Sequence, residues 1–233
     1  MQKIFNFFPL SIYKSTISIP QTEKDKMVNE ILKMEKDSKN YDYKTNDSAW
    51  TGDTQGHEFL HENKEFNKLF LEIEKNIKEY LENFSIDHTQ INLYFQRSWA
   101  TISRKKENIA NHRHAQSHLS FAYYLKKNQD DSKISFFDHS RHNEFIPGFL
   151  DSLSVQKKNL IKSRNVLNSP TILFDTKEDD IVIFPSKTLH GTQRGVLNNE
   201  RISISADIMI VAKNSENLEH LVTPINKWKI FST

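Results

Sequence analysis

The sequence predicts a mainly β protein with supporting α-helices, folded as a double-stranded β-helix of the jelly-roll form. Two observations lead to this prediction. In the first 89 residues, apolar side chains recur at three- and four-residue steps, as they do in amphipathic helices. From residue 90 onward the period changes to two, which is typical of β-strands. Helices followed by six or more strands indicate one β core with helical support.

The first 89 residues are expected to form this support. The segments predicted here are a strand within 4–19, a helix over 22–36, a polar loop over 37–56 around Trp50, and a helix over 63–84. The last helix has the clearest pattern, an apolar stripe made by Phe66, Leu69, Phe70, Ile73, Ile77, Tyr80, Leu81 and Phe84. We interpret this stripe as a packing surface of the core.

The strands are expected between residues 90 and 211. The alternating segments are 91–103, 118–127, 133–138, 171–176, 180–185 and 201–211. A polar and basic insertion over 139–170 interrupts them, and its part 150–167 is expected to be helical. The last segment, 212–233, is expected to pack back on the body through Trp228. The whole chain, 1–233, is therefore predicted to be one domain.

Composition excludes several classes of function. Apolar residues make up 36% and charged residues 27%, so a globular core is expected. The net charge is +2, from 32 basic and 30 acidic side chains, and favours neither nucleic acid nor a membrane surface as a partner. The chain has no cysteine, which excludes thiolate metal sites and fits a cytoplasmic protein. No apolar run of about 18 residues is present to span a membrane.

Two histidine motifs compete as metal sites. The first is an HExxH pattern, in which His57 and His61 on one helix face would bind zinc and Glu58 would act as a general base. Gly52 and Gly56 precede it, and the clear helix begins only after it. We therefore expect this motif to lie in a loop with its polar side chains facing water.

The second motif joins His112 and His114 with the distant His190. Residues i and i+2 of a strand point to the same face, so both imidazoles of the pair can reach one ion. His190 follows a strand that ends at Pro185, on a turn where a third ligand can approach. Three protein ligands leave positions open for other molecules. Taken alone, the pair also fits two exposed histidines at the end of a strand.

A third feature lies eleven residues beyond His190. Arg201 and Ser203 share one face of a predicted strand, while Ile202 and Ile204 lie on the other face and belong to the core. A buried guanidinium can bind a carboxylate through two parallel hydrogen bonds, and the hydroxyl can add a third. The alternative for Arg201 is a surface salt bridge with Glu200.

Taken in order, these motifs resemble a known family. HRH, SFAYYL, ISFFD, DDIVIFPSKTLHG and ERISIS are similar to segments of the Fe(II)/2-oxoglutarate-dependent oxygenases found in bacteriophage and bacterial genomes. The resemblance covers about Trp99 to Asp207, and FPS…H…ERIS is its most specific part. It implies a double-stranded β-helix that uses Fe(II), 2-oxoglutarate and molecular oxygen to oxidise a small molecule or a side chain.

The resemblance also implies roles for individual residues. His112 and His190 match the two metal-binding histidines of the family. Arg201 and Ser203 match the residues that bind the distal carboxylate of 2-oxoglutarate, and Tyr124 matches a strand tyrosine that lines the pocket of this cosubstrate.

His114 is the departure from the wider superfamily, which has a carboxylate ligand at this position. Either three imidazoles hold the metal, or an acid from elsewhere completes the site, and Asp138 is the candidate. Two other hypotheses remain open. One is a cupin-like three-histidine dioxygenase that does not use 2-oxoglutarate and whose Arg201 binds the substrate's own carboxylate. The other is a jelly-roll binding module without turnover.

Overall fold

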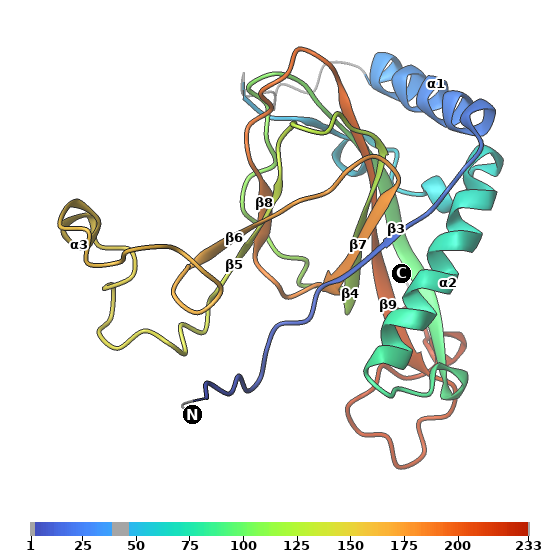
Figure 1. Ribbon diagram of the computed structural model, residues 1–233. Helices are drawn as coiled ribbons and strands as arrows, with labels where there is room; N and C mark the ends of the chain where they lie inside the picture. Colours follow the sequence, from blue (N-terminus) through green and yellow to red (C-terminus); the bar gives the residue numbers. More distant parts are fainter. Residues whose placement is uncertain (1–2, 39–46, 233) are drawn as a thin grey trace.

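The computed structural model describes residues 3–38 and 47–232 (Figure 1). Its helices are α1 (Gln21–Asp37), α2 (Asn67–Asn83) and α3 (Leu153–Lys157). Its strands are β1 (Tyr13–Thr16), β2 (Trp50–Thr51), β3 (Ile91–Ser103), β4 (Leu119–Lys126), β5 (Ile134–Phe137), β6 (Thr171–Phe174), β7 (Asp180–Pro185), β8 (His190–Thr192) and β9 (Arg201–Ala212).

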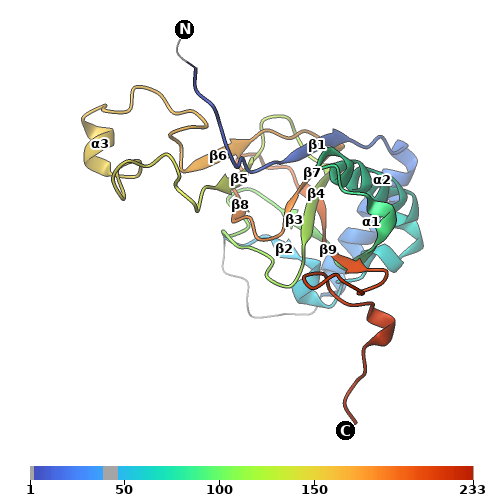
Figure 2. The ribbon, with the colours of Figure 1, turned by 90° about the horizontal axis from the view of Figure 1, so that it is seen from below.

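The strands form two antiparallel sheets. The large sheet has the order β1-β7-β4-β9-β3-β2, and the small sheet has the order β6-β5-β8. Seen from two directions, the small sheet lies on one side of the large sheet, and α1 and α2 cover the other side (Figures 1 and 2). The large sheet therefore has a helix-covered face and an inner face, and the inner face holds the pocket described below.

Helix α2 packs on the large sheet as its apolar stripe predicts. Its residues Ile73 and Ile77 belong to one buried cluster together with Ile202, Ile204 and Ile208 of β9. The helix is shorter than predicted at its start. A 3-10 turn over 64–66 comes first, where the side chain of Asn63 accepts a hydrogen bond from a backbone N–H and caps the turn.

Truncating this stripe is expected to destabilise the fold. Ile73 is 0% exposed, so Ile73→Ala should lower the free energy of unfolding by about 2–5 kcal/mol, because a cavity replaces packed methyl groups. Leu71 is 58% exposed on the same helix, and Leu71→Ala should change this free energy by less than about 0.5 kcal/mol. Urea unfolding of both variants tests this. Equal losses in the two would contradict the buried position of Ile73.

The alternation of β9 separates core from pocket. Ile202 and Ile204 point to the helix-covered face, while Arg201 and Ser203 line a cavity on the inner face. Ser205 also lines this cavity, as the two-residue period of a strand requires. One strand therefore supplies both the centre of the core and one wall of the site.

Neighbouring strands align their inner-face residues in rows across the large sheet. β3 places Thr101 opposite Ser203 and Ser103 opposite Arg201. On the other side of β9, β4 places Tyr124 opposite Ser203. Side chains that are distant in sequence thus meet on one face because strand register holds them there.

Several predicted elements need correction. The segment 150–167 is helical only at α3, which ends before Asn159, a residue in the left-handed region with φ 52°. Leu153 and Leu160 are exposed there, and in α3 only Val155 is buried, so little apolar packing is available to support a longer helix. Trp228 is exposed, and its indole donates to Thr223 within the same tail, so it does not pack on the body as predicted.

Two short strands escaped prediction, and part of one predicted loop cannot be compared. β2 pairs with the end of β3, and β8 begins at His190, where a turn was expected. The predicted loop 37–56 falls partly on residues 39–46, which lie outside the described residues. The division of the chain into support, core and tail stays a prediction. Among the helices that the structure describes, none has the length and apolar character needed to cross a bilayer.

Candidate active site

The three histidines come together at one end of the inner face. His112 and His114 lie on the loop between β3 and β4, and His190 begins β8. His112 and His190 form an antiparallel bridge, in which each backbone N–H donates to the other's carbonyl at 2.8 and 3.0 Å. The backbone N–H of His114 donates to the carbonyl of Ser186 at 3.0 Å. The backbone therefore fixes the position of all three residues.

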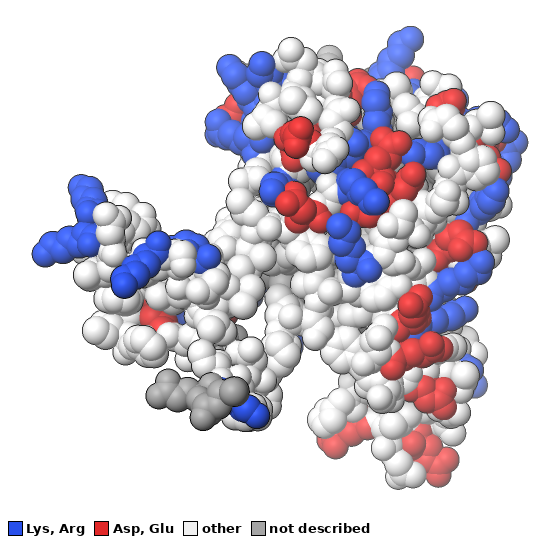
Figure 3. Space-filling model, viewed as in Figure 1, with Lys and Arg blue, Asp and Glu red and all other residues white. Residues whose placement is uncertain are grey.

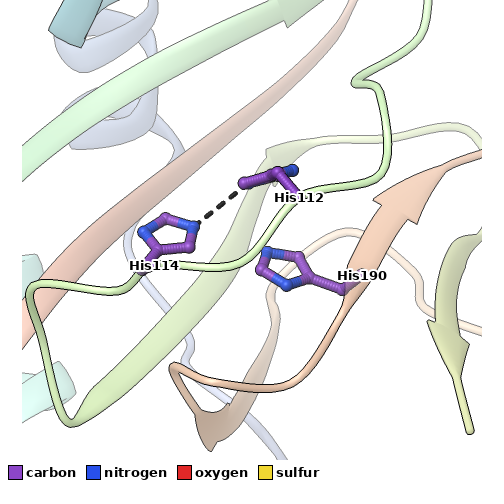
Figure 4. A group of neighbouring side chains, drawn as sticks. All are labelled: His112, His114 and His190. Carbon is purple, nitrogen blue, oxygen red and sulfur yellow. Dashed lines mark hydrogen bonds between the residues drawn. The ribbon is translucent and has the colours of Figure 1, made fainter. Parts of the chain in front are cut away.

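Their side chains converge on one point (Figure 4). One nitrogen from each imidazole lies within 4.8 Å of the others, and Nε2 of His112 is 3.1 Å from Nε2 of His114. Two nitrogen ligands at right angles around an ion, each about 2.1 Å away, would be about 3 Å apart. The spacing of His112 and His114 thus fits two adjacent positions around one metal ion.

The hydrogen bonds of the rings settle which nitrogen carries the proton. Nδ1 of His112 contacts the carbonyl of Ala110 at 2.8 Å, and Nδ1 of His190 contacts the carbonyl of Thr188 at 2.8 Å. A carbonyl can only accept, so both Nδ1 atoms donate and both Nε2 atoms keep a lone pair. Nδ1 of His114 is bound in the same way by a carboxylate, described below. Three lone pairs therefore face one point, which is the donor set of a metal site.

Burial also keeps two of the rings neutral, those of His190 and His112. It lowers the pKa of His190 to about 3, with a further contribution from neighbouring His112. Burial likewise lowers the pKa of His112. Neutral imidazole is the form that binds metal, so these residues need no deprotonation near neutral pH.

The carboxylate behind His114 is Asp207, on the inner face of β9. Its Oδ1 accepts from Nδ1 of His114 at 2.5 Å, and its Oδ2 accepts from Arg97 at 2.6 Å. Gln116 and Ser117 donate to the same carboxylate. Burial acts to raise the pKa of Asp207, but the hydrogen bond from His114 and the charge of Arg97 outweigh it and lower the pKa. Asp207 is therefore a buried carboxylate anion.

Asp138, the acid considered as a third ligand, does not reach the site. It is exposed and accepts hydrogen bonds from the backbone N–H groups of Ser140 and Arg141. Within the described residues, the only group of His, Cys, Asp and Glu side chains close enough to share an ion is that of the three histidines. The geometry thus favours three imidazoles over two imidazoles and an acid.

A cavity of about 360 Å³ extends from the histidines along the inner face. Its size is within the usual range for a small-molecule site. The residues that matter below are His112, His114, His190, Trp99, Thr101, Tyr124, Ile134, Phe184, Arg201 and Ser203, all of which line it. Every predicted site residue therefore borders the same cavity.

Arg201 lies in this cavity without an anionic partner. It is 2% exposed, and its guanidinium donates to the hydroxyls of Ser132 and Ser103. Its Nε has no hydrogen-bond partner, and among the described residues no carboxylate forms an ion pair with it. Burial lowers its pKa, since a buried charge without a counter-charge is costly. A bound carboxylate would supply the missing partner.

The surface salt bridge considered for Arg201 is absent. Glu200 instead pairs with Arg104 at 3.1 Å and with Lys126 at 3.4 Å, on the outside of the molecule. Tyr124 lies opposite Ser203 and is buried, which raises the pKa of its phenol. Tyr124 therefore stays a neutral hydroxyl.

The HExxH motif does not form a metal site. Its residues span a turn and the short 3-10 helix Leu60–Glu62, where His57 and His61 cannot share a helix face. The expectation that the motif faces water was wrong for His61. Its Nδ1 contacts Oγ of Ser98 at 2.7 Å, and its ring stacks on Phe95 with 5.7 Å between centroids. His61 thus has a packing role.

Sequence reasoning missed several residues of the site. Asp207 and Trp99 are the most important, because they contact His114 at its edge and its face. A signal for Asp207 was present, since it continues the two-residue step of Arg201, Ser203 and Ser205. Ser132 left no such signal, because it reaches Arg201 from a loop.

The sequence and the fold are similar to those of known proteins. The family model described as "Putative 2OG-Fe(II) oxygenase" matches residues 97–207. A search of curated proteins finds no match. Among solved structures, the non-heme alpha ketoglutarate dependent epimerase SnoN from nogalamycin biosynthesis is similar. It has 12% identity and a TM-score of 0.55, and the alignment covers 86% of this chain and 78% of that one.

Two further structures share the fold. The carbocyclase SnoK, also alpha ketoglutarate dependent and from nogalamycin biosynthesis, has 11% identity and a TM-score of 0.55, covering 91% and 87% of the two chains. HygX from Streptomyces hygroscopicus, solved with nickel, 2-oxoglutarate and hygromycin B bound, has 10% identity and a TM-score of 0.52, covering 85% and 82%.

These likenesses confirm the predicted jelly-roll fold. The segment matched by the family model includes the three histidines, Tyr124, Arg201 and Ser203. The resemblance predicted from the sequence is therefore confirmed over residues 97–207, the segment that is similar to the family described as putative 2OG-Fe(II) oxygenase.

Proposed function

We propose that this protein is a non-haem Fe(II)/2-oxoglutarate-dependent oxygenase that hydroxylates a small molecule or a side chain. One observation carries the proposal. A single cavity joins three convergent imidazole lone pairs to a buried guanidinium that has no anionic partner. The first group suits a metal cation, and the second suits the far carboxylate of a dicarboxylic acid.

Each residue has a defined task in this proposal. His112, His114 and His190 would hold Fe(II) through Nε2. Arg201 and Ser203 would bind the distal carboxylate of 2-oxoglutarate. When bound, Fe(II), 2-oxoglutarate and oxygen together supply the oxidising power that attacks a substrate C–H bond.

The rest of the pocket would orient the cosubstrate and keep it dry. Ile134 and Phe184 are buried apolar residues that line the cavity, and they would help to exclude water from the reacting region. Tyr124, as a neutral phenol beside Ser203, can donate one hydrogen bond to a carboxylate oxygen. Such fixed donors lower the cost of orienting the cosubstrate.

The proposal also includes a small-molecule substrate and a cytoplasmic location. HygX holds hygromycin B together with 2-oxoglutarate on the same fold, which supports a small-molecule substrate here. A net charge of +2 gives little reason to expect nucleic acid. The absence of cysteine supports a cytoplasmic protein.

His114 also gives support to a second candidate function, a cupin-like three-histidine dioxygenase. The wider superfamily of 2-oxoglutarate oxygenases has a carboxylate ligand where this chain has His114. In the second candidate, Arg201 would bind a carboxylate of the organic substrate, and 2-oxoglutarate would have no part.

Visible absorption without oxygen separates these functions and needs no substrate. A keto acid bound to Fe(II) through two oxygens gives a charge-transfer band. We expect wild-type protein with Fe(II) to develop this band as 2-oxoglutarate is added, and to release succinate slowly once oxygen is admitted. Bound iron with no band at any 2-oxoglutarate concentration would favour the second candidate, or a binding module without turnover.

A related expectation concerns halide. A site whose acid ligand is replaced by Gly or Ala has a vacant coordination position that chloride can fill. If His114 binds the metal, its imidazole occupies this position, so the expected reaction is hydroxylation or desaturation and not halogenation. The charge-transfer band of wild type should stay unchanged when chloride is replaced by sulfate. In His114→Gly, which opens this position, the band should shift with chloride. A chloride-dependent band in wild type would contradict the assignment of His114 as a ligand.

A further inference from the structure

Asp207 stands out among the buried acids because its carboxylate contacts a candidate metal ligand directly. It is 0% exposed, and its Oδ1 lies 2.5 Å from Nδ1 of His114. Its partner Arg97 is part-exposed and has a second acid within reach, Asp53 at 3.6 Å. Arg97 therefore has another partner, whereas Nδ1 of His114 has only Asp207.

We propose that Asp207 is a positioning residue that supplies, from behind His114, the negative charge that a carboxylate ligand would place on the metal directly. This inference rests on the proposed function, because it assumes a metal ion at the three histidines. A carboxylate that accepts from Nδ1–H holds the proton on Nδ1, fixes the ring orientation and makes Nε2 a stronger donor.

The orientation of the His114 ring is fixed by two neighbouring side chains. Its ring is held at the edge by Asp207 and on the face by Trp99, which stacks on it at 5.6 Å with 19° between the planes. The other two rings have neutral anchors, the carbonyls of Ala110 and Thr188. Only the ring at the position of the missing acid is anchored by a carboxylate.

The proposal predicts in which direction the metal affinity changes when Arg97 is removed. Its guanidinium donates two hydrogen bonds to Oδ2 of Asp207, at 2.6 and 3.0 Å, and partly neutralises the carboxylate charge. If Asp207 serves His114, removing Arg97 leaves more of the carboxylate charge for the imidazole. Arg97→Gln should then bind metal as tightly as wild type or more tightly. If Asp207 and Arg97 only maintain the fold, both variants should bind metal more weakly.

The test is a titration with Co(II) alone, followed by visible absorption and calorimetry. In Asp207→Asn the amide oxygen can still accept from Nδ1–H, so the hydrogen bond to His114 can be kept while the charge is lost. The amide nitrogen cannot accept from Arg97, so the contact with Arg97 is lost as well. We expect Co(II) to bind about 10- to 100-fold more weakly than to wild type, which is the usual effect of losing such a partner. Thermal unfolding of each variant checks that it is folded.

Asp180 provides a matched control. It is also 0% exposed, lies on a strand of the large sheet and pairs with Lys14 at 2.9 Å, but it does not line the histidine cavity. Asp180→Asn should lower the unfolding temperature and leave Co(II) affinity within about twofold of wild type, since the buried carboxylate loses its ion pair with the part-exposed Lys14 at a distance from the histidines.

The outcomes are distinct. Folded Asp207→Asn that binds Co(II) within twofold of wild type would overturn this inference and leave the proposed function intact. An equal loss of affinity in Asp180→Asn, or a weaker affinity in Arg97→Gln, would show that Asp207 acts through general stability. Wild type that binds no Co(II) would instead count against the proposed function itself.

Discussion

His190→Ala and His112→Ala are expected to lose stoichiometric Fe(II) binding. Each removes one of three convergent Nε2 donors, and no other His, Cys, Asp or Glu among the described residues is placed to replace it. The affinity should fall more than about 100-fold, beyond the usual cost of losing an outer partner of a ligand. Anaerobic titration with Fe(II), followed by measurement of protein-bound iron, gives the result.

The HExxH motif supplies the control for this prediction. His57→Ala and His61→Ala should keep about one Fe(II) per chain, although His61→Ala should be less stable because it leaves Ser98 without its ring partner. If iron is lost in these two variants and kept in His112→Ala and His190→Ala, the assigned metal site is wrong.

Arg201→Ala should raise the concentration of 2-oxoglutarate needed for the charge-transfer band by more than about tenfold. Removing one partner of a buried, hydrogen-bonded charge pair costs roughly 2–5 kcal/mol, and about 1.4 kcal/mol corresponds to tenfold. Arg201→Lys should fall between Ala and wild type, because ammonium keeps the charge but loses the two parallel hydrogen bonds.

A surface arginine is the matched control for Arg201. Arg104 pairs with Glu35 and Glu200 outside the cavity, so Arg104→Ala should need the same 2-oxoglutarate concentration as wild type. If Arg201→Ala also behaves like wild type, 2-oxoglutarate is not held by this guanidinium, and the residue's role must be sought in substrate binding.

The order of helices and strands was predictable because both patterns are local. The apolar stripe of α2 and the alternation of β9 each repeat over a dozen residues or more, so neither depends on contacts that are distant in sequence. Elements of a few residues, such as β8, carry too few repeats to be seen. Their existence depends on pairing, and β8 is held by β5 and by the bridge between His112 and His190.

The candidate site was predictable only in part. His112, His114, His190 and Arg201 followed from residue type, spacing and resemblance, and the structure brings them to one cavity. Asp138 was considered and Asp207 was not, because an acid's role depends on strand register. Register sets Asp207 on the inner face of β9, where Arg97 lies opposite and His114 within reach. The sequence alone does not give that pairing.

Because β9 contributes one face to the core and the other to the cavity, substitutions and length changes in this strand should have different effects. A substitution affects one face at a time, so a change among the isoleucines behind the sheet costs core packing but leaves Arg201 and Ser203 on the inner face. Inserting or deleting one residue within β9 would instead exchange the two faces, burying the charges among the helices and turning the isoleucines into the cavity. We therefore expect a change of length in this strand to be more damaging than any single substitution in it, whereas the segment 139–170, outside both sheets, should accept either kind of change.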